Sequence, residues 1–342
     1  MIKTDRYWMP SLRLVLLALA CMVVGSIFTG RGLPMTGQVG PVMDSSHAFH
    51  SIIYDRASAS WFAGAYTQAG DVEGPALVAR SADGLAWDSR FATSDGPVES
   101  ISGFVAQDGL VWALSEASTS PALYAVPSSG GPLEPIWAAE RLDMYLLGGP
   151  SAQAAGIACV GSNRDVGGYL VDMAGNVLTP ELRDLDGHPL FAWDAMEWKG
   201  AWVAGTSRGI GEYHGDWAGK LAVLKDGAWE ITPYAGAGIV QVTTLESDPS
   251  ALYLCTTYGE IQRTTDLRHF TKYFQAEPGS DVRLWEVEGK VVEVSAAGVV
   301  YENGKEVWRT EADFLSLAPG PDGVLAGIVN KDGAAYGVRV TW

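Results

Sequence analysis

The sequence has little cysteine and histidine, with 3 and 5 residues among 342. No Cys-x-x-Cys motif exists, so no zinc or other metal centre is predicted. No glycine-rich loop precedes a helix to hold a phosphate, so no cofactor is expected. The residue patterns of the common metal and nucleotide enzymes are therefore missing.

Positive charge is scarce as well. The chain has 23 Lys and Arg against 40 Asp and Glu, which gives a net charge of −17. A field of that sign repels phosphate groups, so nucleic acid is excluded as a partner, and membrane contact is expected only through the N-terminal segment. Hydrophobic residues at 47% and charged residues at 18% are enough for a packed core.

An uncharged apolar stretch runs from Leu14 to Gly30 and follows three cationic residues. This arrangement is typical of a signal peptide or a short membrane anchor with a cytoplasmic N-terminus. We therefore expect residues 1–30 to direct the chain out of the cytoplasm, where it is either released by cleavage or held at the membrane. A lipid on Cys21 is the alternative. Residues 31–46 contain Gly and Pro without periodicity and are predicted as a linker.

Residues 47–342 contain no long segment with the 3.6-residue apolar period of a helix. Short apolar or alternating runs recur between Gly, Asp, Asn and Pro clusters, which predicts an all-β body. One unit of strand, turn, strand and Asp-Gly-type hairpin recurs seven times, at spacings of roughly 30–50 residues. The units begin near Phe49, Glu99, Asp143, Leu190, Ile239, Asp281 and Asp313. We predict a single β-propeller of seven blades, or of six if one unit is not a separate blade.

The seventh unit ends at Trp342 and shows three strands where its neighbours show four. An unpaired edge promotes aggregation, so a strand from the N-terminal side is expected to complete this blade and close the ring. Gln38–Met43 and Ala48–Tyr54 are the two candidates.

The most specific local motif is Ser81-Ala82-Asp83-Gly84-Leu85-Ala86-Trp87, with a degenerate copy at Thr264–Phe270. It resembles the Asp-box of bacterial neuraminidase repeats, and the resemblance implies a propeller of the sialidase-like superfamily. That superfamily includes enzymes, adhesins and assembly factors. Within the motif, Asp83 is expected to accept main-chain N–H groups and Gly84 to adopt positive φ, so Ser81, Asp83, Gly84 and Trp87 are assigned a structural role.

Sialidase activity would need three Arg, an Asp acid/base and a Tyr nucleophile assisted by Glu, as the resemblance implies. The candidates for these roles are Asp55, Arg56, Glu212 and Tyr213, but their order and spacing in the sequence do not match those of the family. A general glycosidase needs two carboxylates across a pocket. The acids on or just after the expected inner strands are Asp55, Asp194, Glu197, Glu246 and Glu286. Solvated loop acids are the competing interpretation of all five.

Tryptophan is the remaining signal. Four residues at the ends of outer hairpins are interpreted as packing between blades: Trp87, Trp229, Trp308 and Trp342. Four others lie near inner strands or insertions, where they could stack on a sugar or a protein: Trp193, Trp198, Trp217 and Trp285. Cys159 and Cys255 lie in apolar runs and are expected as buried small residues, with a disulfide between them as the alternative.

The working hypothesis is an exported, non-catalytic propeller that binds a protein or carbohydrate on its loop face as a binding or assembly module. The alternative is an exo-acting glycoside hydrolase of the sialidase-like class.

Overall fold

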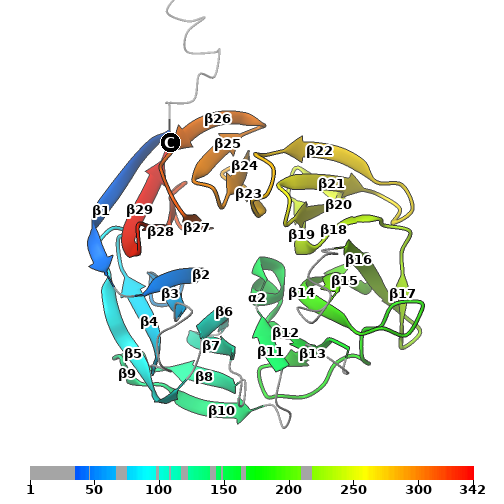
Figure 1. Ribbon diagram of the computed structural model, residues 1–342, viewed down its shortest axis with the longest axis horizontal. Coiled ribbons are helices and arrows are strands. Elements are labelled where there is room, and N and C mark those ends of the chain that lie inside the picture. The colour runs from blue at the N-terminus through cyan, green and yellow to red at the C-terminus, as the bar shows by residue number, and fades with distance from the viewer. Residues whose placement is uncertain are drawn as a thin grey trace, which may run out of the picture.

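Antiparallel sheets stand around a central axis in the computed structural model, each with one strand toward the centre and others stacked outward (Figure 1). The structure describes residues 35–45, 47–66, 75–97, 100–107, 109–116, 122–138, 144–147, 149–162, 167–208 and 218–342. Within these ranges nearly all regular structure is strand, and the predicted single β-propeller is confirmed.

The first half of the ring contains three units of strands. The first unit consists of β2 (Ala48–Asp55), β3 (Ser60–Tyr66), β4 (Pro75–Ser81) and β5 (Asp88–Pro97). The second consists of β6 (Ser100–Gln107), β7 (Leu110–Glu116), β8 (Ala122–Val126) and β10 (Glu134–Ala138), with the short β9 (Gly131–Pro132) beside β5. The third consists of β11 (Met144–Leu147), β12 (Ile157–Ser162) and β13 (Tyr169–Asp172).

The second half contains four units. The fourth unit consists of β14 (Leu190–Trp198), β15 (Ala201–Arg208), β16 (Ala218–Lys225) and β17 (Ala228–Ile231), and the short β18 (Gly236–Ala237) pairs with β16. The fifth consists of β19 (Ile239–Leu245), β20 (Asp248–Thr256), β21 (Glu260–Thr264) and β22 (Thr271–Gln275). The sixth consists of β23 (Val282–Val287), β24 (Lys290–Ser295), β25 (Val299–Glu302) and β26 (Lys305–Arg309). The last consists of β27 (Phe314–Pro319), β28 (Leu325–Lys331), β29 (Ala334–Thr341) and β1 (Thr36–Asp44).

The described strands thus form six four-stranded blades and one smaller unit, the third, with three strands. A single bridge, Val171↔Val177, stands where the fourth strand of that unit would lie. The residues that follow β13 include Pro180 and exposed acids, which do not favour a regular outer strand.

Strand β1 closes the ring, and this corrects part of the domain assignment. Residues 36–44, expected as linker, pair antiparallel with β29 from Thr36↔Thr341 to Asp44↔Ala335. The other candidate segment, Ala48–Tyr54, lies in β2, the innermost strand of the first blade. The strand that completes the last blade therefore contains Gln38–Met43, the first of the two candidates. The last blade thus contains strands from both ends of the described chain.

Buried side-chain amides join neighbouring blades. Asn330 of the last blade accepts from the N–H of Phe49 at 2.9 Å and donates to its carbonyl at 2.7 Å. Gln241 of β19 pairs with Leu284 of β23 in the same way, at 2.8 and 2.9 Å. Apolar clusters fill the spaces between sheets; one joins Phe49 to Ile328 of the last blade. Cys159 and Cys255 are buried and free, so the alternative of a disulfide is wrong.

The Asp-box segment forms a tight turn. The Asp83 carboxylate accepts from the N–H groups of Leu85 and Ala86, both at 2.9 Å, and Gly84 has φ +77°. A Cβ on Gly84 would lie 2.3 Å from the Cβ of Ala326 in the last blade, so a glycine is needed there for packing as well as for conformation. The Trp87 indole donates to the Gly84 carbonyl at 3.2 Å. Asp266 in the degenerate copy accepts from the N–H groups of Arg268 and His269 in the same way.

We expect Asp83→Ala to lower the free energy of unfolding by about 1–2 kcal/mol, because two turn N–H groups lose a charged acceptor. Chemical denaturation measures the change. Asp88→Ala, in the neighbouring strand, is the matched control, since Asp88 accepts one weaker bond from Arg90 at 3.2 Å. Equal stability of the Asp83→Ala and control variants would contradict a structural role for the turn.

No helix in the described ranges has the length and hydrophobicity required to cross a membrane. The expected signal or anchor at residues 1–30 lies outside the described residues.

Candidate functional site

A short helix, α2 (Pro150–Ala155), lies on the axis of the ring, between β11 and β12 in the chain (Figure 1). Two cavities meet beside it. Both are lined by Pro150, Ile52 and Trp285, while Gly149 lines only the smaller cavity and Ala154 only the larger. The smaller cavity lies toward the first residues of the inner strands and the larger toward their last residues. The cavities therefore open toward opposite ends of the channel.

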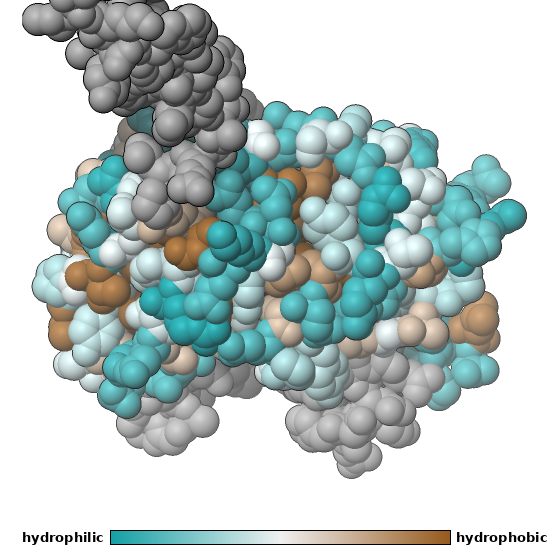
Figure 2. Space-filling view, turned by 90° about the horizontal axis from the view of Figure 1, so that it is seen from above, coloured by the Kyte–Doolittle hydropathy of each residue, from teal (hydrophilic) through white to brown (hydrophobic). Residues whose placement is uncertain are grey.

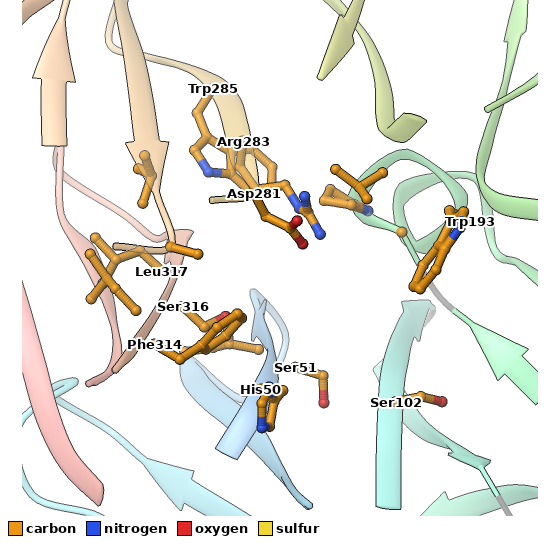
Figure 3. A pocket seen from close by; sticks show the side chains of 17 residues that line it. His50, Ser51, Ser102, Trp193, Asp281, Arg283, Trp285, Phe314, Ser316 and Leu317 are labelled. Atoms are coloured by element: carbon orange, nitrogen blue, oxygen red, sulfur yellow. The ribbon is translucent and has the colours of Figure 1, made fainter. Parts of the chain in front are cut away.

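The smaller cavity has a volume of about 260 Å³ and draws on six inner strands and the start of α2. Figure 3 shows its polar and aromatic side chains around one opening. They are His50, Ser51, Ser102, Trp193, Asp281, Arg283, Trp285, Phe314 and Ser316. Successive side chains of a strand point to opposite faces, so Arg283 and Trp285 of β23, and Asp281 just before it, lie on the face that lines the channel. We call this the aromatic mouth.

Arg283 and Asp281 lie beside each other in the aromatic mouth (Figure 3). The Arg283 guanidinium donates to the carbonyl of Val282 at 3.3 Å and forms no ion pair with any carboxylate in the described part of the chain. Burial raises the pKa of Asp281, and the nearby Arg283 charge opposes that rise. His50 remains accessible to solvent, yet the protein around it lowers its pKa to about 4. The mouth therefore contains the Arg283 guanidinium, the Asp281 carboxyl group and the His50 imidazole, whose lowered pKa leaves it neutral at neutral pH.

The aromatic walls of the mouth are held in place. The Trp193 indole donates to the hydroxyl of buried Ser207 at 2.7 Å, and its ring lies 5.1 Å from that of Phe191. The Phe314 ring lies 4.6 Å from the His50 ring. Trp285 packs partly against the core between the last two blades, and its buried indole N–H has no partner among the described residues.

The larger cavity, of about 1300 Å³, contains most of the acids expected near inner strands. It is lined by Asp55, Arg56, Glu246, Glu286 and others. Asp55 is buried and accepts from the N–H groups of Ala57 and Ser58, at 3.2 and 2.8 Å, so it holds a turn. Glu286 accepts from the N–H and hydroxyl of Ser247 at 3.0 and 3.1 Å. These carboxylates hold main-chain geometry.

Asp194 is fully buried beside α2. Its carboxylate accepts from the N–H groups of Ala152 at 2.8 Å, Val242 at 3.0 Å and Ser151 at 3.2 Å. The Ser151 hydroxyl also donates to the Val242 carbonyl. A Cβ on Gly149 would lie 2.3 Å from the Asp194 Cβ, so only glycine permits this approach. One carboxylate thus joins the helix to the fourth and fifth blades.

Burial raises the pKa of Asp194 from 3.8 to about 7, against the opposing effect of its hydrogen bonds. Because the folded state then binds the proton more tightly than the unfolded state, ionisation of Asp194 lowers the free energy of unfolding as pH rises from about 4 to about 7. Buried Glu293, whose pKa burial also raises to about 7, acts in the same direction, and His50 acts in the opposite one.

We expect Asp194→Asn to remove the Asp194 share of this pH dependence. The stability difference between variant and wild type should change steadily between pH 4 and pH 7 and level off above it. Urea unfolding at several pH values measures this. A difference that is the same at every pH would contradict burial of an ionisable Asp194.

The remaining predicted residues separate into three groups. Trp198 is only 6% exposed and packs in the core of the fourth and fifth blades, so the sugar-stacking alternative is wrong for it. Glu197 is exposed and lines neither cavity. Glu212, Tyr213 and Trp217 lie outside the described residues. Trp193 and Trp285 do line one site, and they are the predicted tryptophans that the structure brings together.

The arrangement does not match a sialidase site. Arg56 lines the larger cavity and Arg283 the smaller, so these two cations lie at opposite ends of the channel. Asp55 and Asp194 are both occupied by main-chain N–H groups. Within the described ranges, no second or third arginine joins Arg283 in the mouth.

Among the described residues, Asp184, Asp186 and His188 place ligand atoms within 4.8 Å of one another. They lie in a hairpin where the Asp184 carboxylate already accepts from the N–H groups of Asp186 and His188, at 2.9 and 2.8 Å. The turn itself accounts for their closeness, so no metal centre is assigned.

Sequence reasoning missed His50, Asp281 and Phe314 as residues of the mouth. The alternation of Asp281, Arg283 and Trp285 at the start of a unit was the available signal, because a period of two places all three on one face. His50 and Phe314 carry no such signal, since only the closure of the ring brings the first and last blades together.

No protein-family model and no curated protein matches the sequence. Solved structures do match the fold. YCF48 from Cyanidioschyzon merolae superposes with a TM-score of 0.58 at 13% identity, over 89% of this chain and 98% of that one. The WD40 β-propeller domain of Doa1 also has a TM-score of 0.58 at 13% identity, over 91% of this chain and 97% of its own. The chain is thus similar to β-propellers in fold, and the Asp-box remains a resemblance of local motif.

Proposed function

We propose that the chain is a non-catalytic binding or assembly module that holds a protein partner at the aromatic mouth. The observation that carries this proposal is the convergence of aromatic and charged side chains from four inner strands, β2, β14, β23 and β27, on one opening. The fold neighbours include a WD40 domain, and β-propellers present broad rigid loop surfaces of this kind. A carbohydrate partner would use the same tryptophans.

The outer rim offers less for a partner. Figure 2 shows a side of the ring where hydrophilic side chains dominate and hydrophobic ones are scattered. The exposed large hydrophobic residues are spread over several blades, among them Val39, Leu110, Ile136 and Tyr258. Scattered single hydrophobic residues are ordinary on a protein surface, whereas contiguous patches mark interaction sites.

Site-specific photo-crosslinking in the native host tests the proposal. A benzophenone amino acid at Ser316, in the mouth, should link one defined protein, and Trp193→Ala should abolish that link. The same group at exposed Glu230 on β17 is the control. Equal products from both positions, or no product from Ser316, would refute a protein partner at the mouth.

The alternative, a glycoside hydrolase, predicts turnover of aryl glycosides by the purified protein, and absence of turnover would contradict it. We further propose that the protein works outside the cytoplasm, since the apolar stretch from Leu14 to Gly30 follows cations. An alkaline phosphatase fused after Trp342 should be active if so, and an inactive, stably expressed fusion would contradict export.

A further inference from the structure

The size of the aromatic mouth limits its ligand. Its volume of about 260 Å³ lies just below the roughly 300–1,000 Å³ of pockets that enclose drug-sized molecules. One or two side chains fit, and a longer oligosaccharide does not. The helix α2 lies beside the inner end of the mouth, where Gly149 and Pro150 line it.

The charges in the mouth select against ions of either sign. An anion that approaches Arg283 meets Asp281 on the same face of the same strand, and a cation that approaches Asp281 meets Arg283. His50 adds no charge at neutral pH, since its pKa is about 4. The other polar groups that line the cavity are serine hydroxyls. A charged ligand would lose hydration and gain an attraction that the second charge largely cancels.

A carboxamide fits this pair of charges. Its carbonyl oxygen accepts from a guanidinium and its N–H donates to a carboxylate, so one neutral group satisfies both. The Asp281 carboxylate has no hydrogen-bond partner among the described residues, and Arg283 makes only its bond to Val282. The ring closure itself uses this chemistry, since Asn330 pairs with both main-chain groups of Phe49.

The aromatic walls supply the apolar half of the site. Trp193 is fixed by Ser207, and Phe314 by its contact with the His50 ring. Side chains that are already ordered lose little conformational entropy on binding, which favours affinity for a small ligand.

We infer that the aromatic mouth recognises an uncharged peptide segment: an apolar or aromatic side chain enters between Trp193, Trp285 and Phe314, and an adjacent carboxamide bridges Arg283 and Asp281. The carboxamide is a main-chain amide or an Asn or Gln side chain. This inference rests on the proposed function and specifies the chemistry of its partner.

Three small ligands that share one phenyl ring test the inference on the full chain. N-acetylphenylalaninamide is neutral, N-acetylphenylalanine is an anion and phenylalaninamide is a cation. Ligand-observed NMR titration gives the three dissociation constants. We expect the neutral ligand to bind about tenfold more tightly than either ion, the difference that one charge-assisted hydrogen bond typically supplies.

Single substitutions should then change the order of the three affinities, one in favour of the anion and the other in favour of the cation. Asp281→Asn should strengthen binding of the anion about tenfold, and Arg283→Gln should do the same for the cation. Arg56→Gln, in the larger cavity, is the matched control and should alter none of the three constants. If Arg283→Gln proves unstable, Arg283→Lys takes its place. This variant keeps the charge and should keep the wild-type order of the three dissociation constants.

Tighter binding of either ion to the wild type would overturn the inference, as would an unchanged order in Asp281→Asn and Arg283→Gln. Absence of binding by all three ligands would overturn it too. Crosslinking from Ser316 is independent of these ligands, so a positive crosslink with negative titrations would leave the proposed function standing and remove only the amide specificity.

Discussion

A chain that begins at Ser45 should fail to form a stable propeller, because β1 is then missing. Strand β29 would lose its pairing with β1 from Thr341 to Ala335 and would keep only its pairing with β28. An unpaired strand of this length promotes edge-to-edge aggregation. Strand β1 also links the last blade to the first, because it pairs with β29 and continues into β2. Loss of β1 should therefore destabilise the neighbouring blades as well. We expect insoluble expression, or a lowered and broadened thermal transition, measured by circular dichroism.

A less drastic variant separates strand pairing from chain length. Gly37 lies against the Trp308 indole, and a Cβ there would come within 1.8 Å of its Nε1. Gly37→Val should therefore destabilise the docking of β1 while leaving the whole chain present. A chain that begins at Arg31 keeps all of β1 and is the control, with wild-type stability expected. A soluble, fully folded chain that begins at Ser45 would show that the amide pairing of Asn330 closes the ring without β1.

Local patterns were enough to predict the class of fold. Short alternating runs between turn residues recur at one spacing, and each needs a neighbouring sheet to bury its apolar face, so a propeller follows. The hairpins confirm the turn chemistry in detail: Asp226-Gly227 and Asn303-Gly304 both have positive φ at each position. The third unit shows the limit of such reasoning. Its repeat spacing is ordinary, yet its outer strand is reduced to the bridge Val171↔Val177.

The candidate site was only partly predictable, for a physical reason. Sequence spacing places Asp281, Arg283 and Trp285 on one face of a strand, but it does not say that His50 lies beside Phe314. That contact depends on which N-terminal segment closes the ring. Asp194 illustrates the opposite case: it was noted as an inner-strand acid, and the structure shows it bonded to a helix that no sequence signal placed on the axis.

The second large effect is expected from Asp194→Ala. Four main-chain N–H groups, of Ser151, Ala152, Val242 and the adjacent Ala195, would lose their acceptor inside the protein. Each buried donor left without a partner costs about 1–3 kcal/mol, so we expect a loss of roughly 3–5 kcal/mol in the free energy of unfolding. In a chain of 342 residues that corresponds to a fall of about 4–7 °C in Tm, which calorimetry measures.

Glu197→Ala is the matched control, because Glu197 lies on the same strand and is exposed. Its effect should stay within about 0.5 kcal/mol. The damage from Asp194→Ala should also be local in origin: amide hydrogen exchange should increase first in α2 and at Val242, where the lost bonds lie, and later in the first blade. Uniform exchange across all blades, or a stability loss no larger than that of Glu197→Ala, would mean that Asp194 does not join the helix to the ring.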